Sequence, residues 1–380
     1  LSSTLCNTFA ILPANPFYAD PRRFTDKAQN GMISTLKHEG GAGMKRGTLV
    51  KTAGFLLCAT VFLMIALNLQ NGHLLALDLS VTKVLAAQRT PFTTALMRGM
   101  TTLCAPITLL VICLALMYIF RKKHYSIPIA INLMVSVSLN YTLKNVFLRE
   151  RPPLLYRAVA ETGYSFPSGH AMAAMAFYGF LIYIVAQSTL GKAVKRLMIG
   201  LLSLVIALVG LSRIDLGVHY LSDVIAGFAV ATAYLIVFSS VVGQYLRSDR
   251  PVPLSPMGIQ KGGRLADSFG YAFDGLIAGF KNERNMIVHF SAMSLVTVFG
   301  FLLNISESEW LACIILFGLV IAMELINTAI ETTVDICMPH TDPRAKVAKD
   351  TAAGAVMLAS IAAAVVGMIV FLPKLWPLLR

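Results

Sequence analysis

Long apolar stretches, separated by short polar segments, make up most of this 380-residue chain. A helix needs roughly 20 apolar residues to cross a hydrocarbon core about 30 Å thick, and most of the stretches are close to that length. They lie at residues 50–70, 101–120, 126–143, 169–188, 197–212, 220–243, 287–304, 310–335 and 352–372. The pattern therefore predicts an all-α integral membrane protein in which each of these stretches is a spanning helix.

The apolar pattern stops once, between residues 244 and 268, where Pro, Gly, Ser and charged residues replace it. Such a composition is typical of a linker. We accordingly predict a six-helix domain at 44–245, a linker at 246–263 and a three-helix domain at 264–380. The stretch LADSFGYAFDGLIAGF, which opens the last domain, predicts an amphipathic surface helix.

Composition supports the membrane assignment and decides how the charge is interpreted. Hydrophobic residues make up 56% of the chain and charged residues 13%, which excludes a soluble domain of ordinary composition. The net charge of +13 comes from short basic clusters at predicted helix ends, so we predict no nucleic-acid partner. Most of the Lys and Arg residues lie on the inner side if the N-terminus is cytoplasmic, as the distribution of basic loops in membrane proteins favours. Residues 1–43 are polar, and we interpret them as a disordered extension or as sequence ahead of a start at Met44.

Three polar motifs interrupt the six-helix domain, each at a predicted helix end on the outer face. They are KNVFLRERP (144–152), YSFPSGH (164–170) and SRIDLGVHYLSD (212–223). Lys144, Arg151 and Arg213 supply three cations, and an Arg can bind two oxygens of one phosphate. A lone Lys or Arg at a helix end is more often an interfacial anchor. The three cations together indicate a phosphate site.

The PSGH segment lies where a loop is predicted to become a helix. There the backbone N–H groups of Ser168, Gly169 and His170 can point at an anion, with the helix dipole behind them. His219 and Asp223 are four residues apart at the next predicted helix start, where the carboxylate can hold one imidazole nitrogen and leave the other free to attack. His219 alone could equally be an interfacial residue. The ordered spacings K-x6-RP, PSGH and SR-x5-H-x3-D favour a nucleophile and its orienting acid.

Together these motifs resemble the type 2 phosphatidic acid phosphatase superfamily over residues 44–245. The resemblance implies a phosphatase that needs no metal or other cofactor. In it His219 would form a phospho-histidine intermediate, Asp223 would orient His219, and His170 would protonate the leaving group. The phosphate-binding residues that the resemblance implies are Lys144, Arg151, Ser168, Gly169 and Arg213.

The stretch ELINTAIETTVD (324–335) places three carboxylates and an amide in an apolar run. In a helix, these side chains fall within roughly an 80° arc along about 16 Å of axis. They are Glu324, Asn327, Glu331 and Asp335. A single Glu there could form a polar contact that holds two helices together. Three carboxylates, however, repel one another unless a cation or protons neutralise them. Mg²⁺ is the expected cation because it prefers carboxylate and phosphate oxygens.

Polar residues near the inner ends of the last three predicted helices complete this second site. They are Glu283 before the seventh span, Glu331 and Asp335 in the eighth, and Lys349 and Asp350 before the ninth. These groups can meet at the cytoplasmic surface, where ATP is available. Glu324 lies a few turns deeper, where a lipid hydroxyl would sit. We interpret His289 as an anchor or a solvated residue.

The pattern E-x-x-N-[ST]-A-x-E-x-x-x-D, with ERN-x-x-x-H and AKVAKDTAAGAV, resembles the prokaryotic diacylglycerol kinase family over residues 264–373, and its undecaprenol kinase branch in particular. The resemblance implies an ATP-dependent lipid kinase in which Glu324 is the general base and Glu283 and Glu331 bind Mg²⁺. The other implied roles are ATP contact for Lys349, Asp350 and Asp335, and support of the site for Asn327. Because family members act as trimers, the resemblance also implies a homo-oligomer.

The two resemblances predict a bifunctional lipid enzyme of the bacterial cell membrane, with a cytoplasmic N-terminus. Its outward-facing phosphatase would act preferably on undecaprenyl pyrophosphate, and its cytoplasmic kinase would phosphorylate undecaprenol, so that both reactions yield undecaprenyl phosphate. One alternative is a phosphatidic acid phosphatase joined to a diacylglycerol kinase. A more distant alternative is a transporter or an inactive scaffold. Transporters place polar residues near the bilayer midplane, whereas here most lie at helix ends.

Overall fold

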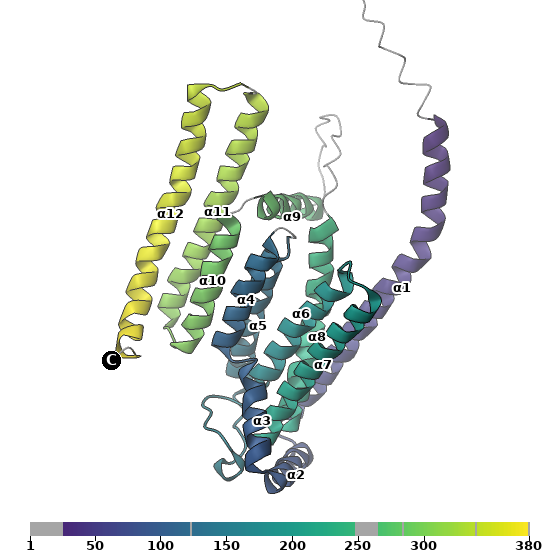
Figure 1. The fold of residues 1–380 in the computed structure, drawn as a ribbon, viewed down its shortest axis with the longest axis vertical. Coiled ribbons are helices and arrows are strands. Elements are labelled where there is room, and N and C mark those ends of the chain that lie inside the picture. Colours follow the sequence, from purple (N-terminus) through teal and green to yellow (C-terminus); the bar gives the residue numbers. More distant parts are fainter. Residues whose placement is uncertain (1–25, 122–123, 248–264, 283–284, 339, 379–380) are drawn as a thin grey trace, which may run out of the picture. The chain divides into compact units, whose positions relative to one another are not determined.

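The computed structural model describes residues 26–121, 124–247, 265–282, 285–338 and 340–378, which form helices joined by loops (Figure 1). In this part of the chain, 8 helices are long and apolar enough to cross a membrane, and the count is 9 if a bent pair is one span. No strand occurs in the described ranges. The chain is therefore an all-α, multi-pass membrane protein, as predicted.

The first helix, α1 (Asp26–Leu67), begins earlier than expected. Residues 26–43, which we interpreted as part of a disordered extension, are helical. No Pro occurs between Asp26 and Leu67, so every residue of the helix can donate its backbone N–H. Contacts divide the chain into two compact units, Leu1–Ala53 and Gly54–Arg380. The linker predicted at 246–263 lies outside the described residues, and that domain boundary stays a prediction.

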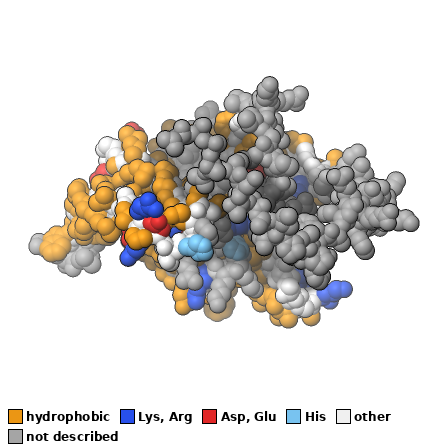
Figure 2. Space-filling model, turned by 90° about the horizontal axis from the view of Figure 1, so that it is seen from above, with side chains coloured by type: hydrophobic (Ala, Val, Ile, Leu, Met, Phe, Trp, Pro, Cys, Tyr) orange, Lys and Arg blue, Asp and Glu red, His pale blue; other side chains and the backbone are white. Residues whose placement is uncertain are grey.

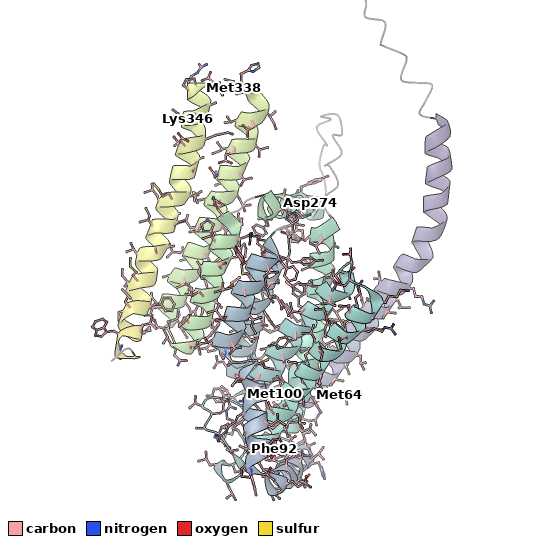
Figure 3. All side chains as sticks on the ribbon, in the orientation of Figure 1. Met64, Phe92, Met100, Asp274, Met338 and Lys346 are labelled. Atoms are coloured by element: carbon pink, nitrogen blue, oxygen red, sulfur yellow. The ribbon has the colours of Figure 1, made fainter. Side chains whose placement is uncertain are left out.

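The second span is broken, whereas the apolar pattern predicted one helix at 101–120. Helices α3 (Pro91–Thr102) and α4 (Pro106–Ile119) meet at a bend of 45°. Pro106 has no backbone N–H, so it cannot continue the hydrogen-bond ladder and instead opens α4. Figure 3 labels Phe92 and Met100 on α3. Before this pair lies α2 (Gly72–Gln88), which the apolar pattern did not reveal.

Four long helices lie between residues 126 and 247. They are α5 (Ser126–Phe147), α6 (Gly169–Gln187), α7 (Lys192–Asp215) and α8 (Leu221–Arg247). Helix α6 contacts the other three. Its Ala174 and Ala176 are fully buried beside Phe177 and Phe180, so small side chains let neighbouring helices approach while the rings fill the remaining space.

Two loops at one end of these helices carry the polar motifs. After α5, Leu148 adopts a left-handed conformation with φ 49°, and the chain continues through a short 3-10 helix at Leu154–Tyr156 before α6 starts. Helices α7 and α8 are joined by residues 216–220 alone. The Ala158 N–H donates to the Leu216 carbonyl at 2.9 Å, so the two loops are tied to each other.

Helix α9 (Leu265–Asn282) lies across the ends of longer helices in Figure 1, and Figure 3 labels Asp274 on it. Its Phe273, Ile277 and Phe280 line an apolar cavity together with residues of α5 and α8. Phe269 and Tyr271 are exposed. The predicted amphipathic helix at the start of the second domain is confirmed.

The last three long helices of the described residues are α10 (Asn285–Leu302), α11 (Glu307–Cys337) and α12 (Pro343–Leu375) (Figure 1). Helix α11 contacts both α10 and α12, and α10 also contacts α4 and α5 of the same unit. Ser306 and Glu309 form a capping box at the start of α11. Asp342 caps α12, whose first residue is Pro343. The loop between α11 and α12 therefore ends at a well-defined helix start; Figure 3 labels Met338, just after α11, and Lys346, within α12.

Gly217, in the loop between α7 and α8, has no room for a side chain. Its φ is +69°, and an added Cβ would lie 2.0 Å from the Tyr156 carbonyl oxygen. Gly217→Ala should therefore lower the free energy of unfolding by at least about 2 kcal/mol, because strain and a clash arise together. Thermal unfolding of the full chain in detergent measures the effect. Gly200→Ala, within α7 and with open space around the added Cβ, is the matched control and should change stability by less than about 1 kcal/mol. Equal unfolding midpoints for Gly217→Ala and the unsubstituted chain would contradict this prediction.

Candidate active sites

A cavity of about 540 Å³, with apolar walls and a group of charged side chains, lies at the ends of α5, α6 and α7. Side chains from all three motifs line it, together with one acidic residue from the loop before α6. They are Lys144, Arg151, His170, Arg213, His219 and Glu161. Lys144 comes from the last turn of α5, and Arg213 from the last turn of α7. The structure thus gathers in one cavity the cations and histidines that the motifs predict.

His219 is buried in this cavity and its ring nitrogens have different surroundings. Its Nε2 lies 3.2 Å from Nη1 of Arg151. A guanidinium only donates hydrogen bonds, so Nε2 must be the acceptor and we assign the ring proton to Nδ1. The lone pair of Nε2 therefore points toward a cation that could also bind phosphate.

Asp223 reaches His219 through Ser165, whereas the sequence predicted a direct contact. His219 lies in the loop before α8, not on the helix, and its Nδ1 is 3.6 Å from Oδ2 of Asp223. The Ser165 hydroxyl lies 3.3 Å from Nδ1 and donates to Oδ2 at 2.5 Å. Ser165 lies in the YSFPSGH motif, and this position was the one sequence signal that Ser165 could connect Asp223 to His219.

Glu161, which the motifs did not single out, lies between two of the predicted phosphate-binding arginines. It accepts a hydrogen bond from Nη2 of Arg213, and its Oε2 is 3.8 Å from Nη2 of Arg151. Arg151 is held in place by the carbonyls of Thr162, Gly163 and Val218 at 2.9 to 3.0 Å. Because a carboxylate resembles two oxygens of a phosphate, Glu161 shows that both arginines can approach one oxyanion.

The start of α6 differs in part from the prediction that the N–H groups of PSGH point at an anion. The Ser168 N–H donates to the Asp223 carbonyl at 3.1 Å, so this N–H does not face an anion. The reason is that α6 and α8 begin side by side. The Ser168 hydroxyl is buried without a hydrogen-bond partner among the described residues. Gly169 also lines the cavity, and a Cβ there would lie 2.9 Å from Oδ1 of Asn140, so glycine allows α5 and α6 to approach.

The protonation of His219 follows from its surroundings. Burial lowers the pKa of His219 well below its ordinary value of 6.5, and the charges of Arg151, Arg213 and Lys144 lower it further. His219 is therefore neutral near pH 7. The neutral imidazole is the form that can attack phosphorus.

The polar stripe on α11 runs from a buried to an exposed end. Glu324 is 1% exposed and Asn327 5%, whereas the side chain of Asp335 is 67% exposed. Both carboxylate oxygens of Glu324 and Oδ1 of Asn327 have no hydrogen-bond partner among the described residues. The Asn327 amide donates to Glu331 at 3.1 Å. A buried carboxylate without a protein partner is costly, which fits a residue that acts on a substrate.

His289 lies beside this second site, and the interpretation of it as a solvated residue is wrong. Its Nε2 lies 3.9 Å from Oε1 of Glu324, and its side chain is 16% exposed. The residue sits one turn into α10, which packs against α11. The ERN-x-x-x-H spacing could have indicated this position, because it places His289 one turn into the helix, near the end where Glu283 lies in the sequence.

The exposed end of the stripe meets the start of α12. Lys349 Nζ lies 2.5 Å from Oδ1 of Asp335. Both residues line a cavity of about 720 Å³ beside the α11–α12 loop, together with Asp350 and Lys346. Figure 2 looks toward this end of the helices, where Lys or Arg and acidic side chains gather among apolar ones. The three ATP-contacting residues predicted here thus lie around one cavity.

The predicted metal ligands are only partly placed. Glu283 lies outside the described residues. Within the described ranges, this site included, no three His, Cys, Asp or Glu side chains gather as a metal site. Glu324, Asn327 and Glu331 nevertheless offer oxygen donors, and oxygen is the donor that Mg²⁺ prefers. Glu324 and Asn327 each have at least one oxygen atom without a hydrogen-bond partner among the described residues.

The C-terminal part of the chain, after α9 begins, has named relatives. Residues 270–371 match the family described as prokaryotic diacylglycerol kinase. The chain is 41% identical over 112 residues to the undecaprenol kinase of Bacillus subtilis (strain 168), which covers 30% of this chain and 91% of that protein.

The first half also has relatives. Residues 125–247 match the PAP2 superfamily. The chain is 32% identical over 189 residues to phosphatidylglycerophosphatase B of Bacillus subtilis (strain 168), over 48% of this chain and 90% of that protein. A crystal structure of a transmembrane PAP2-type phosphatidylglycerolphosphate phosphatase from Bacillus subtilis is similar with a TM-score of 0.47 and 27% identity, covering 50% of this chain and 96% of that one. The chain therefore belongs to two families, with a PAP2 superfamily domain followed by a prokaryotic diacylglycerol kinase domain.

Proposed function

We propose that this chain is a bifunctional enzyme that removes phosphate from a lipid at one site and adds phosphate to a lipid alcohol at the other. The observation that carries the proposal is the opposite charge of the two sites. The first gathers Lys144, Arg151 and Arg213 around a buried histidine, which suits a phosphate ester. The second buries Glu324 with no hydrogen-bond partner among the described residues, which suits removal of a proton from a hydroxyl.

At the first site, Nε2 of His219 attacks phosphorus. The Nε2–P bond forms while the bond from phosphorus to the leaving oxygen breaks, and His170 gives that oxygen a proton. Asp223, acting through Ser165, stabilises the positive charge on the imidazole. Water then attacks phosphorus, the Nε2–P bond breaks and His170 takes a proton from the water, which regenerates the enzyme and releases phosphate. Arg151 and Arg213 neutralise the phosphate oxygens throughout.

At the second site, Glu324 takes the proton of the lipid hydroxyl. The hydroxyl oxygen forms a bond to the γ-phosphorus of ATP, and the bond from that phosphorus to ADP breaks. Lys349 forms an ion pair with Asp335 in this structure. When ATP binds, the Lys349 ammonium leaves Asp335 and pairs with an ATP phosphate. Asp350 lines the same cavity. The Asn327 amide donates a hydrogen bond to the Glu331 carboxylate and so orients it. Glu331 and Glu283 would hold Mg²⁺, which would supply charge neutralisation for the phosphates when bound.

The preferred substrates are undecaprenyl pyrophosphate and undecaprenol. Both reactions would then yield one product, undecaprenyl phosphate, and the name of the undecaprenol kinase relative supports the kinase half. The name of the phosphatidylglycerophosphatase B relative favours a glycerolipid phosphate at the first site instead. A phosphatidic acid phosphatase joined to a diacylglycerol kinase is therefore the second candidate.

We further propose that the sites face opposite sides of the bacterial cell membrane. Helix α8 starts at the first site and ends at Arg247. Helix α10 therefore starts on the other side, and α11 returns there with Asp335 near its end. The basic loops place this second side in the cytoplasm with the N-terminus, where ATP is available. The kinase resemblance implies that the chain works as a homo-oligomer, a trimer.

Substitution should separate the two activities. His219→Gln should lower phosphate release at least about 1,000-fold and leave lipid phosphorylation within about twofold, because it removes the nucleophile of one site only. Glu324→Gln should do the reverse. The measurement uses the purified full chain with undecaprenyl pyrophosphate, phosphatidic acid, undecaprenol and diacylglycerol, and His73→Gln and Glu307→Gln serve as exposed controls. Loss of both activities in one folded variant would argue for a composite site, and higher rates with the glycerolipids would favour the second candidate.

The phosphatase should remain active in mild acid. Because the pKa of His219 is lowered, the nucleophile stays unprotonated below pH 6.5, and kcat/KM should fall only at a lower pH. Lys144→Gln removes one of the cations that lower this pKa, so it should move the acid limb of the profile upward. Comparing both proteins on one substrate cancels the titration of the substrate. An acid limb centred at 6.5 in the unsubstituted chain, or unmoved by Lys144→Gln, would show that the surroundings do not set the reactivity of His219.

Sidedness can be tested in sealed right-side-out vesicles. A soluble phosphorylated substrate added outside should be hydrolysed without detergent, because the first site faces outward. External ATP should support lipid phosphorylation only after the vesicles are opened. Kinase activity with external ATP in vesicles that exclude a membrane-impermeant dye would show that the helix count or the orientation is wrong.

A further inference from the structure

Arg149 lies in the first motif but outside its K-x6-RP spacing, and it contacts the acid that orients the nucleophile. Its Nη1 is 2.5 Å from Oδ1 of Asp223 and 2.8 Å from the hydroxyl of Ser222. Its Nη2 is 2.8 Å from Oδ2 of Asp78. The side chain is 8% exposed. One buried guanidinium therefore joins two buried carboxylates.

Asp78 comes from α2, which holds none of the three motifs. It is 1% exposed. Its Oδ1 accepts the backbone N–H of Ser222 at 3.0 Å, and its Oδ2 accepts the Ser222 hydroxyl at 2.5 Å. Asp78 is thus fixed to the first turn of α8, next to Asp223. A carboxylate held in this way can fix Nη2 of the Arg149 guanidinium while Nη1 reaches Asp223.

The two oxygens of Asp223 have separate partners. Oδ1 pairs with Arg149, while Oδ2 accepts the Ser165 hydroxyl at 2.5 Å and the Tyr220 N–H at 2.9 Å. The Arg149 guanidinium lies over the Tyr220 ring, 4.3 Å from its centroid. Any rotation of Asp223 would break contacts on both sides. The orientation of Oδ2, and through Ser165 that of His219, therefore depends on the pairing of Oδ1.

We propose that Asp78 and Arg149 are positioning residues of the phosphatase reaction, and that they act on His219 through Asp223 and Ser165. The inference rests on the proposed phosphatase function. Arg149 balances the charge of Asp223, which keeps this carboxylate an acceptor for Ser165, and Asp78 sets the direction of the guanidinium. Helix α2 is in this way part of the catalytic apparatus, although it contributes no residue that touches the phosphate.

A purely structural role would tie α2 to α8 without affecting the chemical step, and the two roles predict different kinetics. Loss of positioning lowers kcat and leaves KM nearly unchanged, because the phosphate is bound by other residues. Arg149→Lys keeps the charge but cannot bind both carboxylates, so kcat for lipid phosphate hydrolysis should fall about 10- to 100-fold with KM within about twofold. Asp78→Asn keeps the shape and should lower kcat about 10-fold. Kinase activity of the same preparations should not change.

A double variant separates stability from positioning. Arg149→Gln leaves two buried carboxylates without their cation, and its unfolding midpoint in detergent should fall sharply. Adding Asp78→Asn removes one of these charges, so the midpoint should recover at least in part while kcat stays low. If Arg149→Gln does not fold, Arg149→Lys and Asp78→Asn carry the test. Arg98→Gln is the matched control, since Arg98 is exposed and its hydrogen bond goes to the backbone of the same α5–α6 loop, at the Ala158 carbonyl 2.8 Å away.

The outcomes are distinguishable from failure of the proposed function. If the unsubstituted chain hydrolyses no lipid phosphate, or His219→Gln is fully active, the phosphatase assignment itself fails. If His219→Gln is inactive but the folded Arg149→Lys and Asp78→Asn variants keep their kcat, the positioning role is overturned. A kcat that recovers together with the unfolding midpoint in the double variant also overturns it. Low kcat with recovered stability supports it.

Discussion

Burial of charge in an apolar protein is the constraint on which both sites depend. A charged group that loses water must find an opposite charge or hydrogen bonds, or it destabilises the fold. The first domain meets this constraint with its own residues. Arg149 is balanced by Asp78 and Asp223, and Arg213 by Glu161. The second domain leaves both carboxylate oxygens of Glu324 and Oδ1 of Asn327 without a hydrogen-bond partner among the described residues, as suits groups whose partners arrive with a substrate.

This difference explains how the loops of the first domain are built. The link between α7 and α8 is short, and the loop before α6 is tied to it through Ala158 and Leu216. Backbone carbonyls fix Arg151, and α2 fixes Arg149. Arg151 is thus oriented before a phosphate binds, so little reorganisation of this arginine is required when charge develops on the phosphate oxygens. In the three-helix domain, regular helices alone place Glu324, Asn327 and Glu331, because their spacing on α11 already puts them on one face.

The sequence predicted what depends on local pattern. Apolar runs predicted the spans, and motif spacing predicted that Lys144, Arg151, Arg213, His170 and His219 would line one cavity. The break before Pro106 and helix α2 were missed because span prediction weighs mean hydropathy more than single residues. Ser165, Glu161 and Asp78 were missed for another reason. Their roles arise from contacts between segments that are far apart in the chain, and loop conformation sets those contacts. His289 was misinterpreted because its neighbour Glu324 comes from another helix.

If one chain holds two separate sites and only the first forms a covalent bond to phosphate, the phosphate removed from a lipid must pass through His219. The most direct measurement is to incubate the purified full chain with a ³²P-labelled lipid phosphate in EDTA, stop the reaction in alkali and map the labelled peptide. We expect an acid-labile label on the peptide that contains His219, and no label in His219→Gln. Continued hydrolysis without protein-bound phosphate, or a label within residues 264–380, would contradict this assignment of the two chemistries.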